Sequence, residues 1–340
     1  MTSPSTAPSI LVVRFSSIGD ILLTTPLIRA LRRRHPAAKI TALTKRAFTA
    51  LLSDHPGLSQ VLALEPAGSI PSLAASLRKH RFTHLLDLHG SLRSRALRLL
   101  VPGRWTGYRK QRVAREILIR TKRDRYGGHR PMAERYFEAA RELDVAPDGG
   151  PAEFGLGAGA VETADRWIRD AGLGRERRLV ALAPGAAHFT KRWPAEYWVS
   201  LVERVAAAGW DAAVVGGADD VELCRRVAAA GGGRAASVAG SFGLQETGAL
   251  LRQARAVVSG DTGVMHMATA VGTPVIALFG PTVEAFGFFP YDARATVLQR
   301  ELPCRPCSSQ GGARCPLGHH RCLREIPPDE VGAALERLLR

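Results

Sequence analysis

Short apolar runs of strand length alternate with segments of helical periodicity along nearly the whole chain. Helical segments separate most of these runs, as crossover connections between parallel strands require. The pattern predicts an α/β fold with doubly wound parallel sheets. The expected strands are Ile10–Phe15, Lys39–Thr44, Gln60–Leu64, His84–Leu88, Trp105–Tyr108, Leu179–Ala183, Ala212–Val215, Ser237–Ala239, Ala256–Ser259 and Pro274–Leu278.

The alternation pauses between about residues 143 and 159, where Gly and Pro are concentrated. Such a composition is typical of a linker. We therefore expect two Rossmann-like domains, residues 1–157 and 158–340, facing each other across a cleft. A length of 340 residues suits two domains. Ligands of open α/β sheets bind at the carboxyl ends of the strands, so the turns there are the candidate sites.

The chain is strongly basic, with a formal net charge of +16 and a pI near 10.6. Between Arg93 and Arg135 fourteen Lys or Arg stand against three acids, which favours an anionic partner: nucleic acid, membrane or glycolipid. No nucleic-acid-binding motif or reading helix accompanies this charge, so we expect no nucleic acid. Residues 1–9 are Ser/Thr/Pro-rich and do not resemble a signal peptide, which predicts a cytoplasmic protein.

The turn after the first expected strand reads Ser16-Ser17-Ile18-Gly19-Asp20. Ser and Asp are preferred at helix starts, so Asp20 could simply cap the following helix. Alternatively, Asp20 faces the cleft as a general base. Pro26 should either kink this helix or delay its regular start.

Two turns of the second half carry candidate ligand-binding residues. After Ala183, either Lys191 or Arg192 could supply positive charge for a phosphate, or the loop is merely solvated. After Val215 comes a double Gly and an acid pair, Asp219 and Asp220. One of these carboxylates could hold a ribose hydroxyl or cap a helix.

The strongest turn is Ser259-Gly260-Asp261-Thr262-Gly263-Val264, where a buried strand ends and an apolar helix begins. The backbone N–H groups of Thr262, Gly263 and Val264 predict an anion site. His266, one turn later, could bond a phosphate or steady the loop. Neither the P-loop nor the dinucleotide fingerprint is present, and no Asp-x-Asp pair predicts a metal.

Taken together, these turns resemble glycosyltransferase family 9, the heptosyltransferases of lipopolysaccharide core assembly. The resemblance implies a GT-B architecture and inverting transfer with neither metal nor cofactor. It implies ADP-heptose as donor and the Kdo/heptose-lipid A inner core as acceptor, with another nucleotide sugar as the alternative. The motifs that carry it are Phe15-Ser16-Ser17-Ile18-Gly19-Asp20, Pro184-Gly185, Lys191-Arg192-Trp193-Pro194, Ser259-Gly260-Asp261-Thr262-Gly263 with His266, and Phe279-Gly280-Pro281-Thr282.

The same resemblance implies a role for each matched residue. Asp20 would deprotonate the acceptor, Lys191 would neutralise donor phosphate, and Asp261 would position its loop. The remaining donor contacts would be Asp219 at the ribose, Phe242 at the base, and Thr262, Gly263, Val264 and His266 at the diphosphate. The anionic lipid A core would be held, at the inner face of the inner membrane, by Ser17, Gly19, Arg93, Arg109 and Lys110.

The tail contains a cysteine group, Cys304, Cys307, Cys315 and Cys322, with His319 and His320 nearby. A Cys-x-x-Cys followed by two further cysteines can bind zinc tetrahedrally. The second pair lacks this spacing, so reduced structural thiols are the alternative. A zinc ion here would be structural and remote from the transfer reaction.

Overall fold

The computed structural model describes residues 7–174, 176 and 178–340, and they form two compact units. The first contains residues up to Lys110 together with Met132–Gly155, and the second contains Gln111–Pro131 and Leu156–Arg340. The main boundary thus lies beside the predicted residue 157. The segment Gln111–Pro131 differs from the prediction, because its Leu118 and Tyr126 pack with Ala285 and Phe286 of the second unit.

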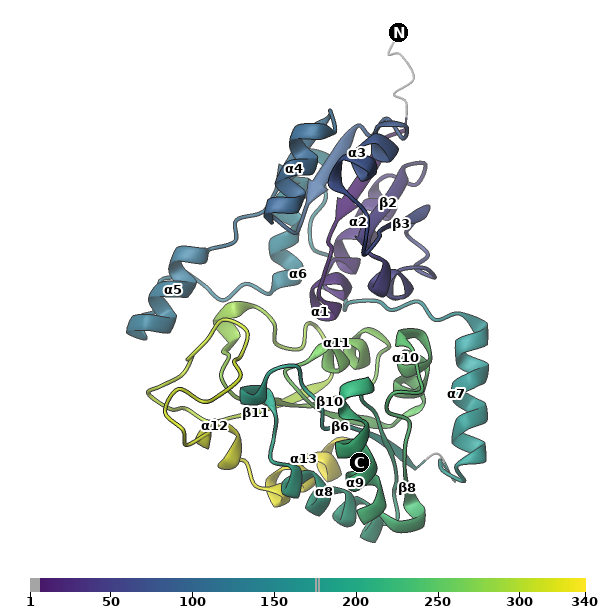
Figure 1. Cartoon of the computed structure of the whole chain (residues 1–340), viewed down its shortest axis with the longest axis vertical. Coiled ribbons are helices and arrows are strands. Elements are labelled where there is room, and N and C mark those ends of the chain that lie inside the picture. Colours follow the sequence, from purple (N-terminus) through teal and green to yellow (C-terminus); the bar gives the residue numbers. More distant parts are fainter. Residues whose placement is uncertain (1–6, 175, 177) are drawn as a thin grey trace. The chain divides into compact units, whose positions relative to one another are not determined.

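The first unit is built on a five-stranded parallel sheet (Figure 1). Its strand order is β3-β2-β1-β4-β5. Successive strands are added on one side of β1 up to β3, and β4 and β5 are then added on its other side, so the strand order reverses between β1 and β4. The strands are β1 (Ser9–Val13), β2 (Lys39–Lys45), β3 (Gln60–Leu64), β4 (His84–Asp87) and β5 (Arg104–Gly107).

Helices cover both faces of this sheet because its strands are apolar on both sides. One face packs against α3 (Ile70–Arg78) and α4 (Leu92–Leu100) through a core that includes Leu11, Leu77 and Leu97. The remaining helices are α1 (Ile18–Leu22), α2 (Thr25–Arg34), α6 (Met132–Arg135) and the 3₁₀ segments η1 (Arg46–Leu51) and η2 (Tyr136–Leu143). Pro26 delays the regular helix: α1 ends at Leu22, and α2 begins one residue before the proline.

The second unit is built on a six-stranded parallel sheet of order β11-β10-β9-β6-β7-β8. This is the order of a doubly wound dinucleotide-binding sheet, with the reversal between β6 and β9. The strands are β6 (Leu179–Ala183), β7 (Asp211–Val214), β8 (Ala235–Ser237), β9 (Ala256–Gly260), β10 (Val275–Phe279) and β11 (Ala295–Gln299).

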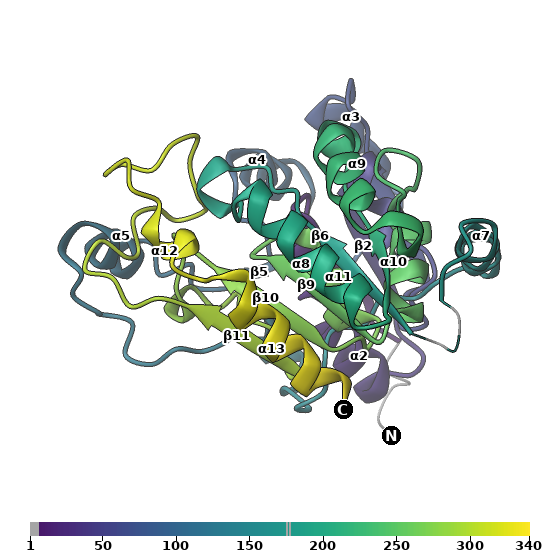
Figure 2. The same cartoon turned by 90° about the horizontal axis from the view of Figure 1, so that it is seen from below.

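Helices α8 (Ala195–Ala207), α9 (Val221–Ala230) and α13 (Pro328–Leu339) lie across one face of this sheet (Figure 2). They bury Trp198, Val227 and Leu335 against alternate residues of the strands. The unit's other helices are α5 (Arg112–Thr121), α7 (Ala158–Asp170), α10 (Leu244–Gln253), α11 (Gly263–Ala270), α12 (Arg321–Arg324) and the short 3₁₀ turns η4 (Phe189–Lys191), η5 (Ala218–Asp220), η6 (Gly232–Arg234) and η7 (Glu284–Phe286).

The predicted α/β class with parallel sheets is confirmed, and every expected strand overlaps an observed one. The edge strand β11 was missed, because its residues are only half-buried and lack a continuous apolar run. Nowhere among residues 7–174, 176 and 178–340 is a helix long and apolar enough to span a bilayer.

Candidate functional site

Each sheet has a point where the strand order reverses. The charged and titratable residues of the candidate site follow the two strands that meet at this point. In the first unit, the loops after β1 and β4 carry Arg14, Asp20 and His89. In the second, the loops after β6 and β9 carry Lys191 and Asp261. Loops that separate at such a point leave a crevice at the carboxyl ends of the strands, which is the usual ligand site of these sheets.

Asp20 lies in the first turn of α1, and both of its carboxylate oxygens are bonded. Oδ2 accepts hydrogen bonds from the backbone N–H of Ser17 (3.3 Å) and from its hydroxyl (2.9 Å). Oδ1 pairs with Nη2 of Arg14 at 2.5 Å and accepts from the hydroxyl of Tyr136 at 3.3 Å. Asp20 therefore caps its helix, as one of the two interpretations expected, but it also belongs to a charged network.

That network fixes the charge state of Asp20. Burial alone would raise the pKa of its carboxyl, but Arg14 and the Ser17 hydrogen bonds outweigh burial and lower the pKa below its ordinary 3.8. Burial raises the pKa of Tyr136 well above 10, so its hydroxyl stays protonated and donates. An ionised Asp20 is thus present throughout the neutral range, with 15% of its side chain exposed.

The loop after β4 is tied to the same network. Arg14 donates from Nη1 to the Leu88 carbonyl at 2.6 Å, and the Lys110 ammonium donates to the His89 carbonyl. Burial, Arg14 and Lys110 together lower the pKa of His89 to about 4. Its imidazole is therefore neutral at pH 7.

The structure places the predicted acceptor residues of the first unit in two groups. Ser17 and Lys110 make the bonds described above, and Gly19 is buried in α1 directly before Asp20. Arg93 and Arg109 are exposed. The backbone N–H of Arg109 donates to Glu138 at 2.9 Å, so that arginine's backbone is anchored.

In the second unit, the ammonium of Lys191 lies 2.7 Å from Oδ2 of Asp261. Asp261 is buried, and the same oxygen accepts a hydrogen bond from the Thr282 hydroxyl at 2.6 Å. Of the pair, the lysine is the more exposed member, at 15% against 8%. A buried carboxylate therefore holds the cation beside the loop that opens α11.

That loop has the geometry of an anion site. Thr262 is the N-cap residue of α11, and Thr262, Gly263 and Val264 are half-exposed. The N–H groups of a first helical turn have no acceptor within the helix. His266 is buried, with its ring edge-on to Phe288 at 6.4 Å, which favours the interpretation that it steadies the loop.

The two acids after β7 have different surroundings. Asp220 accepts from the Gly217 N–H at 3.1 Å and lies where a Cβ at Gly185 would collide with its carboxylate. Asp219, the predicted ribose ligand, is exposed. Phe242, expected at the base, is half-buried with its ring 5.9 Å from that of Trp167 on α7.

The cysteine-rich tail contacts the loop that carries Lys191. Thr190 exchanges hydrogen bonds with Gly312: the Gly312 N–H donates to the Thr190 hydroxyl at 2.8 Å, and the Thr190 N–H donates to the Gly312 carbonyl at 3.1 Å. The imidazole of His320 lies 3.2 Å from the Thr190 carbonyl and stacks on Phe189. The tail therefore lies against the loop that carries Lys191.

The tail cysteines are all free thiols. Within the described part of the chain, no group of three or more His, Cys, Asp or Glu is arranged to hold a metal ion. Burial raises the pKa of Cys322 to about 11, so this thiol stays protonated at neutral pH.

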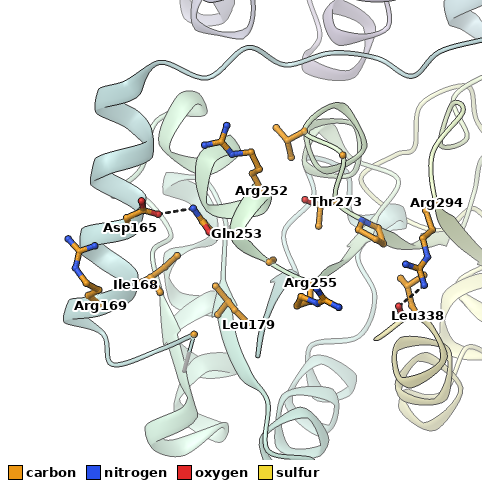
Figure 3. Close-up of a pocket in the computed structure, with 15 residues that line it drawn as sticks. Asp165, Ile168, Arg169, Leu179, Arg252, Gln253, Arg255, Thr273, Arg294 and Leu338 are labelled. Atoms are coloured by element: carbon orange, nitrogen blue, oxygen red, sulfur yellow. Dashed lines mark hydrogen bonds between the residues drawn. The ribbon is translucent and has the colours of Figure 1, made fainter. Parts of the chain in front are cut away.

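A pocket of about 650 Å³ in the second unit lies at the amino ends of strands β6, β9 and β10, at the other end of the sheet from Lys191 and Asp261. Figure 3 shows four arginines spread around it: Arg169, Arg252, Arg255 and Arg294. Helices α7, α10, α11 and α13 end near this edge. Helix C-termini carry partial negative charge that stabilises nearby cations, which accounts for the arginines without a ligand.

Sequence reasoning missed several residues of these networks. Tyr136 lies far along the chain from Asp20, and no local pattern connects them. Thr282 belongs to a motif that was noticed, but its bond to Asp261 depends on β9 and β10 being neighbours. Arg14 lies near the end of the first expected strand, and a charged residue in an otherwise apolar strand was the available signal.

Comparison with known proteins gives a consistent result. The model of glycosyltransferase family 9 (heptosyltransferase) matches residues 70–316. The chain is 28% identical to lipopolysaccharide heptosyltransferase 1 of Pseudomonas aeruginosa, over 97% of this chain and 98% of that protein. It is 27% identical to lipopolysaccharide heptosyltransferase 2 of Salmonella typhimurium, with the same coverage of both chains.

Solved structures share the fold. A family 9 glycosyltransferase from Veillonella parvula superposes with a TM-score of 0.83 at 21% identity, covering 100% of this chain and 99% of that one. ADP-heptose LPS heptosyltransferase II of E. coli gives a TM-score of 0.76 at 25% identity, covering 97% and 98%. These likenesses confirm the predicted GT-B class of two Rossmann-like domains.

Proposed function

Because this chain belongs to glycosyltransferase family 9, the heptosyltransferases, we propose that it transfers a heptose from ADP-heptose to the inner core of lipopolysaccharide. The observation that carries this proposal is the Lys191 ammonium, held by buried Asp261 beside the N-terminal turn of α11. Relatives with nearly full-length similarity bear names that state lipopolysaccharide heptosyltransferase activity.

The second unit is the proposed donor site. A nucleoside diphosphate carries charge that a lysine and a helix N-terminus can stabilise together, without a carboxylate-bound cation. Asp261 orients Lys191, and the backbone of Thr262, Gly263 and Val264 receives phosphate oxygens. Phe242 and Asp219 contact the base and ribose in this proposal; Asp219 is exposed and Phe242 is half-buried.

The first unit is the proposed acceptor site, with Asp20 as the general base. An acceptor hydroxyl is a weak nucleophile until its proton is being removed. In an inverting transfer, the base and the leaving diphosphate act on opposite sides of the anomeric carbon, so we assign them to different units. Arg14 keeps Asp20 ionised, while Arg93, Arg109 and Lys110 offer positive charge to phosphates and carboxylates of the lipid A core.

The test is a transfer assay with purified, deacylated inner-core acceptor and a panel of nucleotide sugars. We expect ADP-heptose to be used at least about a hundredfold more efficiently than the UDP and GDP sugars. Transfer should persist in excess EDTA, because the proposed charge neutralisation needs no cation. Preference for another nucleotide sugar would overturn the donor assignment, and EDTA inactivation reversed by magnesium would overturn the metal-free mechanism.

The acceptor assignment has its own test. Reversing the charge of Arg93 or Arg109 to Glu should raise the KM for the acceptor at least about fivefold, because a charge-assisted bond to phosphate is lost. The KM for the donor should stay within about twofold of the wild type. If the donor KM rises instead, the roles of the two units are reversed.

A further inference from the structure

The most exposed side of α4 carries two leucines. Leu92 is 83% exposed and Leu99 is 88% exposed, the two highest values among the exposed large apolar side chains of the described residues. They are seven positions apart, two helical turns, and so lie on the same side of the helix about 10 Å from each other. The opposite side buries Ser94 and Leu97 toward the core of the first unit.

This arrangement inverts the usual amphipathic helix, whose outward face is polar. Exposed arginines surround the leucines: Arg95 lies on the stripe between them, and Arg93 and Arg98 lie on its two flanks. The nine residues of α4 include no acid. Leucines in the centre with long cations at the edges are typical of helices that lie in the headgroup region of a bilayer.

We propose that α4 is the surface by which this protein lies on an anionic lipid bilayer. Leu92 and Leu99 enter the headgroup region, and the three arginines contact lipid phosphates. The inference deepens the proposed function and rests on it in one respect: a lipopolysaccharide acceptor is anchored in a membrane.

The position of α4 in the first unit connects this surface with the proposed base. The helix begins directly after Ser91, which follows the His89–Gly90 loop. Lys110 bonds the His89 carbonyl of that loop, Arg14 bonds the adjoining Leu88 carbonyl, and Arg14 also pairs with Asp20. A membrane-anchored acceptor at the start of α4 would therefore be connected, through contacts within one unit, to Asp20, the carboxylate that is proposed to activate its hydroxyl.

Charge decides against two other occupants. A second copy of α4 would bring two sets of unneutralised arginines together, which is electrostatically unfavourable. Nucleic acid would match the arginines but gives no reason for leucines at the centre of the face. An anionic bilayer satisfies both features.

The experiment is co-sedimentation of the full chain with vesicles of phosphatidylcholine and phosphatidylglycerol that contain no lipopolysaccharide. We expect wild-type protein to bind these vesicles and to bind pure phosphatidylcholine much more weakly. The double variant Leu92→Ser/Leu99→Ser should lower the partition coefficient at least about tenfold. Arg95→Gln should lower it about fivefold, as expected for one cation near an anionic surface.

Leu317→Ser is the matched control, because Leu317 is also well exposed, at 64%, but belongs to the second unit. It should bind vesicles like the wild type. The double variant should also keep wild-type kinetics on a soluble, deacylated acceptor, which shows that it folds and that its defect concerns the lipid.

Two results would overturn the proposal. One is wild-type vesicle binding by the double variant. The other is a change of oligomeric state on removal of the leucines, measured by sedimentation velocity, with vesicle binding unaffected; this would make the face a contact between copies. Because the vesicles contain no acceptor, failure of heptosyl transfer would leave this test unaffected, and the two proposals can fail separately.

Discussion

The candidate sites of the two units each contain an ion pair with one more buried member. The more exposed member is an anion in the first unit and a cation in the second. In the first, an arginine that is 11% exposed stands behind Asp20, which is 15% exposed. In the second, Asp261, 8% exposed, stands behind Lys191, 15% exposed. Each buried partner fixes the charge and direction of the residue in front of it. One sheet thus presents an anion at its strand-order reversal, and the other presents a cation.

The difference indicates a division of labour. A fixed carboxylate can accept a proton, whereas a fixed ammonium beside a helix N-terminus can stabilise a leaving diphosphate. Stability alone does not account for the ion pairs, since a buried pair contributes little net free energy after desolvation. The predictions below test whether each pair acts through its more exposed member.

The largest expected effect concerns Asp20→Asn. The amide keeps the size of the side chain and one oxygen for Ser17, but it removes the proposed base. We expect kcat to fall at least about a hundredfold, because general base catalysis typically contributes that much or more. Calorimetry should show unchanged ADP binding, since the proposed donor site lies in the other unit.

Asp20→Asn also breaks the pair with Arg14, so we expect the free energy of unfolding to fall by about 1–3 kcal/mol. Asp148→Asn is the matched control, because Asp148 pairs with Arg29 at 2.7 Å in the same unit without joining the Asp20 network. It should lose stability but keep turnover. Near-normal turnover of Asp20→Asn would leave Asp20 only as a helix cap.

The next effect concerns Lys191→Ala, which should weaken ADP binding by about tenfold to a hundredfold through loss of a charge-assisted bond. Arg192→Ala is the neighbouring control: Nε of Arg192 donates to the Ala186 carbonyl at 2.8 Å and its side chain is exposed. Its effect on the Kd for ADP should be smaller. An unchanged Kd for Lys191→Ala, measured by calorimetry, would remove Lys191 from the donor site.

The fold and the turn residues were accessible from sequence because they depend on local patterns. Apolar runs predicted the strands. In each parallel sheet the carboxyl ends of the strands lie at the same end, and the predicted residues that follow them are Gly19, Asp20, Asp261 and Gly263. The partners of these residues were not accessible. Tyr136 and Thr282 reach their carboxylates through tertiary packing, which no spacing encodes.

The inserted segment illustrates the same limit. Residues Gln111–Pro131 read as a continuation of the first domain, since sequence order was the only guide. Their assignment follows from Leu118 and Tyr126 packing with Phe286. Likewise, the cysteine spacing suggested a zinc site, whereas in the structure Gly312 of the tail donates a hydrogen bond to Thr190.

A smaller effect should follow from loosening that tail. Thr190→Val removes the hydroxyl that accepts from the Gly312 N–H, so the loop beside Lys191 loses one tether. We expect the Kd for ADP to rise about threefold to tenfold, corresponding to one hydrogen bond. Thr190→Ser keeps the hydroxyl and should restore binding. A lower Tm with an unchanged Kd would show that the tail stabilises the fold without positioning Lys191.

The smallest effect concerns His89, the half-buried imidazole in the loop that is tied to the Asp20 network. Its pKa is lowered from 6.5 to about 4 by burial, Arg14 and Lys110, against the opposing charges of Asp87 and Asp20. Between those two values the unfolded chain binds a proton that the folded protein does not, so stability falls as the pH drops from about 6.5 to 4. His89→Gln cannot titrate, and the variant should lose less stability over this window than the wild type does. Since the ring is half-exposed and screened by solvent, we expect a difference of about 1 kcal/mol in urea unfolding. Above pH 7 the pH dependence of the two proteins should coincide. Parallel profiles down to pH 4 would mean that burial, Arg14 and Lys110 do not keep His89 neutral. The first site could then carry a titrating cation beside Asp20, contrary to the contrast with the Lys191 site.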